Sequence, residues 1–134
     1  MVGELEKAVL EAALDTVPVE FSIVDKNDNV LAWNKHDTRI FKRPKGVLGR
    51  NVRDCHPKQS LGKVEAILAE MKAGKRDKAQ FWIDLRIGAE GDPQKVLIEY
   101  YALRSASGEY LGCLEASQNI TAMQKMTGQR RLLD

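Results

Sequence analysis

The chain has 134 residues, enough for one domain that buries about two thirds of its unfolded surface. Hydrophobic residues make up 43% of the chain and charged residues 30%, a composition that excludes disordered and fibrous proteins. The 21 Lys and Arg residues against 19 Asp and Glu residues give a net charge of +2, too small for a nucleic-acid footprint.

The two cysteines, Cys55 and Cys113, lie in a chain with no signal peptide. No apolar run approaches the ~20 residues that a membrane span needs. We therefore expect a cytoplasmic protein with reduced cysteines and no membrane partner. The basic cluster at residues 42–45 is typical of a solvated turn, so no nucleic-acid partner is expected either.

The first 16 residues predict an amphipathic helix, because apolar residues recur at spacings of three and four before Pro18: Val2, Leu5, Val9 and Ala12. The apolar stripe is wider than an exposed helix needs. It indicates packing either against its copy in a homodimer or against the outer face of the chain's own sheet. Both arrangements stay open, and they are compatible.

Two strands are expected next, over residues 19–25 and 29–33, with turn chemistry between them. The period of two places Val19, Phe21 and Ile23 on one face of the first strand. Asn34 has the chemistry of a helix N-cap, so residues 35–42 predict a short helix.

A clear amphipathic helix is predicted from Pro57 to the stop at Gly74, with Leu61, Val64, Leu68 and Met71 on one stripe. Three strands follow, at residues 79–87, 96–105 and 110–118, and a final segment at 121–134 has helical character. The order predicts an α+β fold, a five-stranded antiparallel sheet with helices on one face, plus the two terminal helices.

Short motifs mark the joints between these elements: Val24-Asp25, Trp33-Asn34, Gly49-Arg50, Lys72-Ala73-Gly74, the run from Gly108 to Gly112, and Asn119-Ile120-Thr121. In this order they resemble a PAS domain, a small sensor and signalling module of bacterial regulators. The resemblance covers residues 17–121 and implies a PAS core there, with a flanking helix at 1–16 and a helical extension at 122–134. Asn119 replaces the Asp that usually closes the motif.

Residues 41–57 more narrowly resemble PAS modules that accompany hemerythrin-like domains in some anaerobic bacteria, where a similar Cys-His-Pro occurs. In this chain the stretch is Cys55-His56-Pro57.

A Cys-His catalytic pair is disfavoured because adjacent residues of an extended chain point apart, so we expect no enzyme. A zinc site would need His36, Cys55, His56 and Cys113 to converge without any CxxC pair, so no metal site is expected. The plain interpretation is that Pro57 begins the helix and Cys55 packs.

In PAS folds a small ligand lies between the sheet and the helices. The resemblance therefore implies a ligand site lined by His56, Phe21, Trp33, Phe41, Val64, Leu68, Phe81, Tyr100 and Arg39, with Ile23, Val52, Ile83, Tyr101 and His36 as further candidates. Most of these residues are equally explained as core. His56 is also the candidate axial ligand if the cofactor is haem, and the cofactor is otherwise unknown.

The hypothesis is a cytoplasmic PAS domain that binds a small ligand or cofactor and passes the change through a homodimer to a signalling output protein on a separate chain. One alternative is a ligand-free interaction and dimerisation module. Another alternative is a haem-based gas or redox sensor that uses His56. An enzyme that uses Cys55 is a third and more remote alternative.

Overall fold

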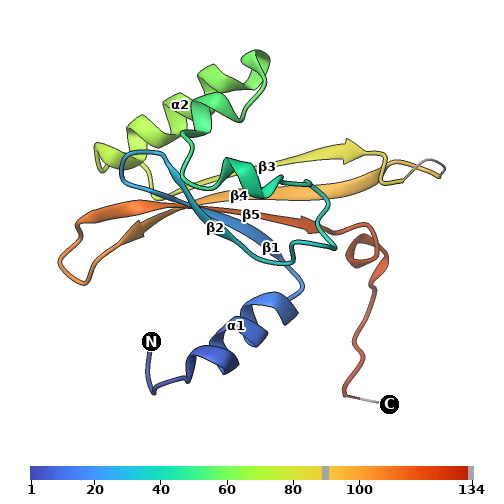
Figure 1. The fold of residues 1–134 in the computed structure, drawn as a ribbon. Helices are drawn as coiled ribbons and strands as arrows, with labels where there is room; N and C mark the ends of the chain where they lie inside the picture. The colour runs from blue at the N-terminus through green and yellow to red at the C-terminus, as the bar shows by residue number, and fades with distance from the viewer. Residues whose placement is uncertain (89–90, 133–134) are drawn as a thin grey trace.

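The computed structural model describes residues 1–88 and 91–132. Its centre is one antiparallel sheet with strand order β2-β1-β5-β4-β3 (Figure 1). The strands are β1 (Glu20–Asp25), β2 (Val30–Trp33), β3 (Lys78–Leu85), β4 (Gln94–Arg104) and β5 (Tyr110–Asn119). All five predicted strands are confirmed, and so is the α+β fold class.

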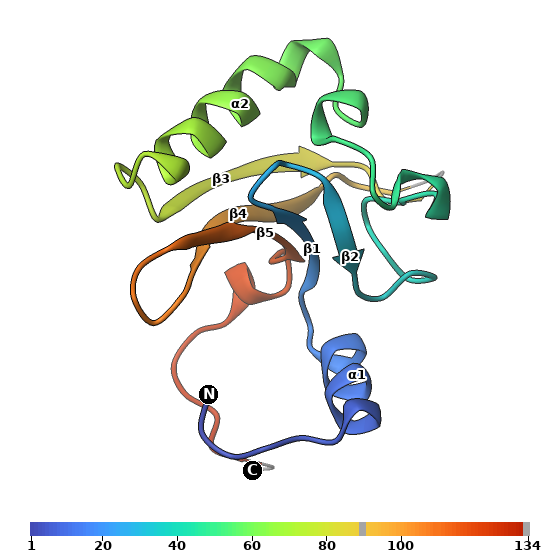
Figure 2. The same ribbon diagram turned by 60° about the vertical axis from the view of Figure 1, so that its left-hand side comes forward.

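The long helix α2 (Lys58–Lys72) covers one face of the sheet (Figures 1 and 2). It buries Val64, Leu68 and Met71, as the apolar stripe predicted. Pro57 is its N-cap rather than its first residue, and Gly74 ends it with φ of 72°, a conformation that favours glycine. The core beneath α2 includes Val30, Val52, Val96, Ile98 and Cys113.

The N-terminal helix α1 (Lys7–Thr16) lies on the other side of the sheet from α2 (Figures 1 and 2). It begins at Lys7, not within residues 1–6, and Gly3 has a positive φ of 83°. None of its residues is buried. Its last turn is held by Asn34, whose side-chain amide donates to the carbonyl oxygens of Leu14 and Val19 at 2.6 and 3.0 Å.

The predicted helix at residues 35–42 is wrong, because this segment is a series of turns. It has one internal backbone hydrogen bond, from the Thr38 N–H to the Lys35 carbonyl oxygen at 3.1 Å, and several of its other backbone groups bond to side chains. The Glu20 carboxylate accepts from the N–H groups of Ile40 and Phe41 at 2.6 and 3.1 Å. The buried Arg39 guanidinium donates to the carbonyl oxygens of Phe21, Asn34 and Phe41. Asn34 is therefore not an N-cap, because its side chain hydrogen-bonds to α1 and β1 instead.

The predicted C-terminal helix over 122–134 is also wrong for the residues described. Only one 3-10 turn forms, η3 (Met123–Lys125), and Gly128 has a positive φ of 62°. The remainder of that prediction, Leu133 and Asp134, lies outside the described residues. Two further 3-10 turns, η1 (Lys45–Val47) and η2 (Val52–Asp54), lie between β2 and α2. Within residues 1–88 and 91–132, no helix has the length and apolar character to cross a membrane.

A candidate ligand-binding groove between α2 and the sheet

A groove with a volume of about 660 Å³ lies between α2 and the sheet. Three groups of residues line it. The α2 side contributes Ser60, Lys63, Val64 and Ile67, which share one helix face by their spacing. The sheet contributes Phe81, Ile83, Ile98, Tyr100 and Glu115, and the loops before α2 contribute Phe41, Lys42, Arg43, Cys55, His56 and Pro57.

The sheet wall is apolar and only partly covered. Phe81 and Ile83 remain 38% and 36% exposed, although their cross-strand partners Ile98 and Val96 are buried. The Phe81 ring stacks on that of Tyr100 with 5.9 Å between centroids. The sequence predicted a half-buried strand here, whereas these side chains face the open groove. Large apolar residues around a concave surface of this size are typical of small-molecule sites.

At the inner end of the groove is a cavity of about 20 Å³, large enough for a single water molecule. It shares Arg43, His56, Val64, Tyr100 and Glu115 with the groove, and Ser22 and Cys113 add to its lining. The polar groups of the site therefore gather at the inner end, where two strands supply neighbouring residues: Tyr100 and Glu115 are cross-strand partners in β4 and β5.

Arg43 and Glu115 form an ion pair across this inner end. An Nη of Arg43 lies 3.4 Å from a carboxylate oxygen of Glu115, a long contact for this pair. The Nε–H of Arg43 is buried and has no hydrogen-bond partner among the described residues. Burial raises the pKa of the Tyr100 hydroxyl, and the Glu115 carboxylate raises it further, so Tyr100 stays protonated.

His56 lines both the groove and its inner cavity. Its Nδ1 lies 3.0 Å from the Val52 carbonyl oxygen, which can only accept, so Nδ1 carries the proton in the neutral ring. The Nε2 lone pair is then left for a ligand. The neighbouring Cys55 thiol donates to the carbonyl oxygen of Asn51, the N-cap of η2, at 3.5 Å, so each side chain of this pair bonds to the backbone at the start of η2.

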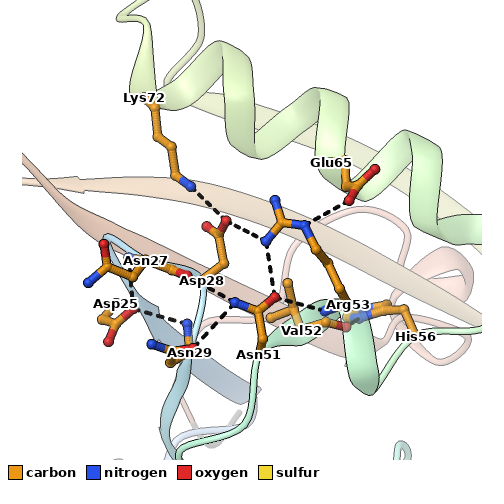
Figure 3. A network of polar contacts seen from close by, with 10 residues as sticks. All are labelled: Asp25, Asn27, Asp28, Asn29, Asn51, Val52, Arg53, His56, Glu65 and Lys72. Atoms are coloured by element: carbon orange, nitrogen blue, oxygen red, sulfur yellow. Dashed lines mark hydrogen bonds and ion pairs between the residues drawn. The ribbon is translucent and has the colours of Figure 1, made fainter.

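A polar network holds the loop that carries His56 (Figure 3). The Asp28 carboxylate, buried in the β1–β2 turn, accepts from Arg53 at 3.0 Å and from Lys72 at 2.6 Å. Arg53 also donates to Glu65 of α2 at 2.7 Å, and Asn51 accepts from the Arg53 backbone. The network ties the β1–β2 turn and η2 to the middle and the last turn of α2.

The structure brings six of the predicted site residues to the groove or its inner cavity: Phe41, His56, Val64, Leu68, Phe81 and Tyr100. Phe21 is not among them. Its neighbour Ser22 faces the cavity, so Phe21 and Ile23 lie on the opposite face of β1. Trp33 donates to His36 instead, and Arg39 is buried beside Glu20. Of the predicted site residues, Phe21, Trp33 and Arg39 therefore lie outside the groove and its inner cavity.

Sequence reasoning missed Arg43, Lys63 and Glu115. Arg43 was assigned to a solvated turn with its basic neighbours, but its side chain turns inward to the groove. Lys63 shares the spacing of Ser60 and Ile67, a signal that could have identified it. In the described part of the chain, no group of three or more His, Cys, Asp or Glu side chains could hold a metal ion. The four possible zinc ligands therefore do not come together: His36, Cys55, His56 and Cys113.

A model of the PAS domain family matches residues 10–121. The C-terminal domain of a protein from Streptococcus mutans is similar in structure, with 30% identity, a TM-score of 0.86, and 95% and 94% of the two chains covered. The PAS domain of a protein from Colwellia psychrerythraea has 15% identity and a TM-score of 0.60, over 86% of this chain and 97% of that one.

VqmA of Vibrio cholerae, in a structure described as bound to DPO, has 13% identity and a TM-score of 0.60, over 91% of this chain and 65% of that one. At 13% to 15% identity the likeness concerns the fold. A search of curated protein sequences found no match. The family match covers most of the chain and agrees with the strand order described above. This chain belongs to the PAS domain family.

Proposed function

We propose that this PAS domain binds a small molecule in the groove between α2 and the sheet. The observation that carries the proposal is the groove itself, about 660 Å³ in volume, with apolar walls and a polar inner end. Small-molecule sites commonly have volumes of roughly 300–1,000 Å³ and this division of apolar and polar lining. VqmA, which has the same fold, is described as bound to DPO. No catalytic role is assigned to Cys55 or His56.

The signal would pass from the groove as a shift between two arrangements of α2 and the loops beside it. A ligand that contacts His56 and Arg43 favours one position of their loops. The Asp28 network connects the His56 loop to α2, so both would move together. A cytoplasmic output protein on a separate chain would receive the change. The narrower resemblance to PAS modules that accompany hemerythrin-like domains concerns residues 41–57.

We propose a homodimer as the assembly that transmits this change. Apolar side chains on α1 stay exposed, from 38% for Leu14 to 51% for Val9. A second copy of α1 would cover them with a matching stripe and give a two-fold interface. Molar mass in solution tests this: the dimer should be lost in Val9→Glu, whereas Glu11→Lys, a charge change on the same helix, should keep it. A dimer that survives deletion of residues 1–16 contradicts the α1 interface.

Groove binding is tested by native mass spectrometry of the purified protein in two variants. Ile67→Trp fills the groove from α2, and Ala66→Trp adds the same side chain at an exposed α2 position that does not line it. A co-purifying small molecule should be lost in Ile67→Trp and kept in Ala66→Trp. A protein that carries no small molecule in either form favours the alternative, a ligand-free interaction module.

Haem is a second candidate ligand, favoured by one observation. The Val52 carbonyl fixes the His56 tautomer and leaves Nε2 free, the arrangement that axial histidines require. His56 would hold the iron, and haem would supply gas or redox sensing when bound. Reconstitution with hemin should give a Soret band that His56→Ala removes and His36→Ala keeps. A band that is unchanged in His56→Ala contradicts this candidate.

A further inference from the structure

The charges around the groove are unbalanced. Lys42, Arg43 and Lys63 line it, against the single carboxylate of Glu115. Lys42 donates to the Asp37 carbonyl oxygen at 3.0 Å, which does not neutralise its charge. The Lys63 ammonium has no hydrogen bond or ion pair within residues 1–88 and 91–132. Cations on two sides of an opening with apolar walls attract anions.

The inner end has an unused donor for an anion. The Nε–H of Arg43 is buried and has no partner in the part of the chain that the structure describes, and one Nη is already directed to Glu115 at 3.4 Å. A buried donor without an acceptor destabilises the folded state by about 1–3 kcal/mol. A ligand carboxylate is an acceptor that guanidinium groups bind well, through two parallel N–H donors. Filling this position would remove the penalty.

The apolar sheet wall of the groove determines what the rest of the ligand must be. From the Tyr100–Glu115 pair, the sheet surface becomes apolar toward β3, through Ile98 and Phe81 to Ile83. Ile67 faces this surface from α2. Among the described residues that line the inner cavity, Arg43 is the one arginine or lysine. Arg39 is also buried nearby, but its guanidinium donates to the carbonyl oxygens of Phe21, Asn34 and Phe41 and does not line the cavity. The polar end therefore suits one anionic group and not several. The opening has room for an apolar body alongside the exposed faces of Phe81 and Ile83.

We propose that the ligand is an amphiphilic monocarboxylate. Its carboxylate binds the Arg43 guanidinium at the inner end, and its apolar body lies along Ile98, Phe81 and Ile83. Lys63 attracts the anion at the opening without a fixed contact. This inference rests on the proposed small-molecule function and narrows it to a chemical class.

The test compares octanoate with octanol, which has the same chain without the charge, by calorimetry at neutral pH. Wild-type protein should bind octanoate at least about tenfold more tightly than octanol. Arg43→Gln should remove this preference. Lys63→Gln should weaken octanoate about two- to fivefold at low salt and less at high salt. Lys45→Gln, a nearby lysine outside the groove, should change nothing, and Ile67→Trp should abolish binding.

Three results would overturn the inference. Equal affinity for octanoate and octanol excludes recognition of the charge, and absence of binding of either excludes the class. A preference for octanoate that persists in both Arg43→Gln and Lys63→Gln places the carboxylate elsewhere. Lys63 is exposed, so its variant informs the test even if Arg43→Gln fails to fold. The small-molecule function would still stand in each case if native mass spectrometry finds another molecule that Ile67→Trp expels.

Discussion

The Asp28 carboxylate and the Lys72 ammonium meet at 2.6 Å, and they join the β1–β2 turn to the last turn of α2 (Figure 3). The Asp28 side chain is only 2% exposed, and the same oxygen accepts from Arg53 at 3.0 Å. Its φ of 68° lies in the left-handed region. One residue therefore combines a buried charge, two cationic partners and an unusual backbone conformation.

Asp28→Asn should destabilise the protein by about 1–3 kcal/mol, because it removes the buried charge while asparagine tolerates the left-handed conformation. The loss is limited because Arg53 and Lys72 are 43% and 36% exposed and regain water. Urea unfolding measures it. Asp54→Asn is the matched control, since Asp54 is exposed. Equal stability of the two variants would show that the network contributes nothing.

Backbone geometry gives a second prediction, which concerns two glycines. Gly112 has φ of 155°, and a Cβ there would meet the Val24 carbonyl oxygen at 2.1 Å. Gly112→Ala should therefore disturb the pairing of β5 with β1 and cost several kcal/mol, on the order of 3 or more. Gly62 lies inside α2 with nothing within 4 Å of its Cβ position.

Gly62→Ala should stabilise the protein by about 0.5–1 kcal/mol, because alanine is the better helix former and meets no obstacle. The melting temperatures of the two variants should move in opposite directions. A tolerated Gly112→Ala would mean that the β5–β1 register relaxes locally, and a destabilising Gly62→Ala would mean that α2 packs more closely at that position.

The sequence predicted those parts of the fold that depend on local patterns. Alternation in β3, β4 and β5 and the 3.6-residue stripe of α2 each belong to a continuous segment, and the structure has them. The turn at residues 35–42 depends on Glu20 and Arg39, whose contacts reach back about 20 residues along the chain. No local pattern carries that information. The C-terminal segment had moderate helical character weakened by Gly128, and its described residues, 122–132, are all exposed, so no packing stabilises a helix there.

The site was predictable in part for the same reason. The sequence predicted that Phe21 and Ile23 are on the groove face of β1. These apolar residues lie on the opposite face of the strand, and the polar residues Glu20 and Ser22 are the ones buried toward α2. Alternation shows that a strand has two faces, not which one covers the core. Arg43 was missed because its partner, Glu115, lies 72 residues away.

The two cysteines should differ strongly in reactivity. Cys113 is 2% exposed, and burial raises the pKa of its thiol to about 12, with a smaller contribution from Glu115. Cys55 is partly exposed at the groove. In native protein, a thiol reagent at pH 8 should modify one cysteine, and Cys55→Ser should abolish the reaction. Cys113→Ser should leave it unchanged. Denaturant should restore two reactive thiols in the wild type. Fast modification of native Cys55→Ser would contradict the burial of Cys113.

Glu99 on the outer face of the sheet gives a prediction about pH. Its carboxylate accepts from Lys78 at 2.9 Å, Tyr101 at 2.7 Å and Gln80 at 3.0 Å. The bond to Lys78, followed by that to Tyr101, holds the pKa of Glu99 below its ordinary value. A carboxylate with a lowered folded-state pKa adds stability that is fully present above the unfolded-state pKa, about 4.3. That stability is lost as the pH falls through the folded-state pKa.

Glu99→Gln should therefore cost about 1 kcal/mol at pH 7, and the difference from wild type should shrink as the pH is lowered from 5 toward 2. Urea unfolding at several pH values measures it, at constant ionic strength because salt screens the Lys78 pair. Glu109→Gln, an exposed carboxylate in the β4–β5 turn, should show no such convergence. A difference between Glu99→Gln and wild type that stays constant down to pH 2 would mean that the ionised carboxylate is not what Lys78 and Tyr101 recognise.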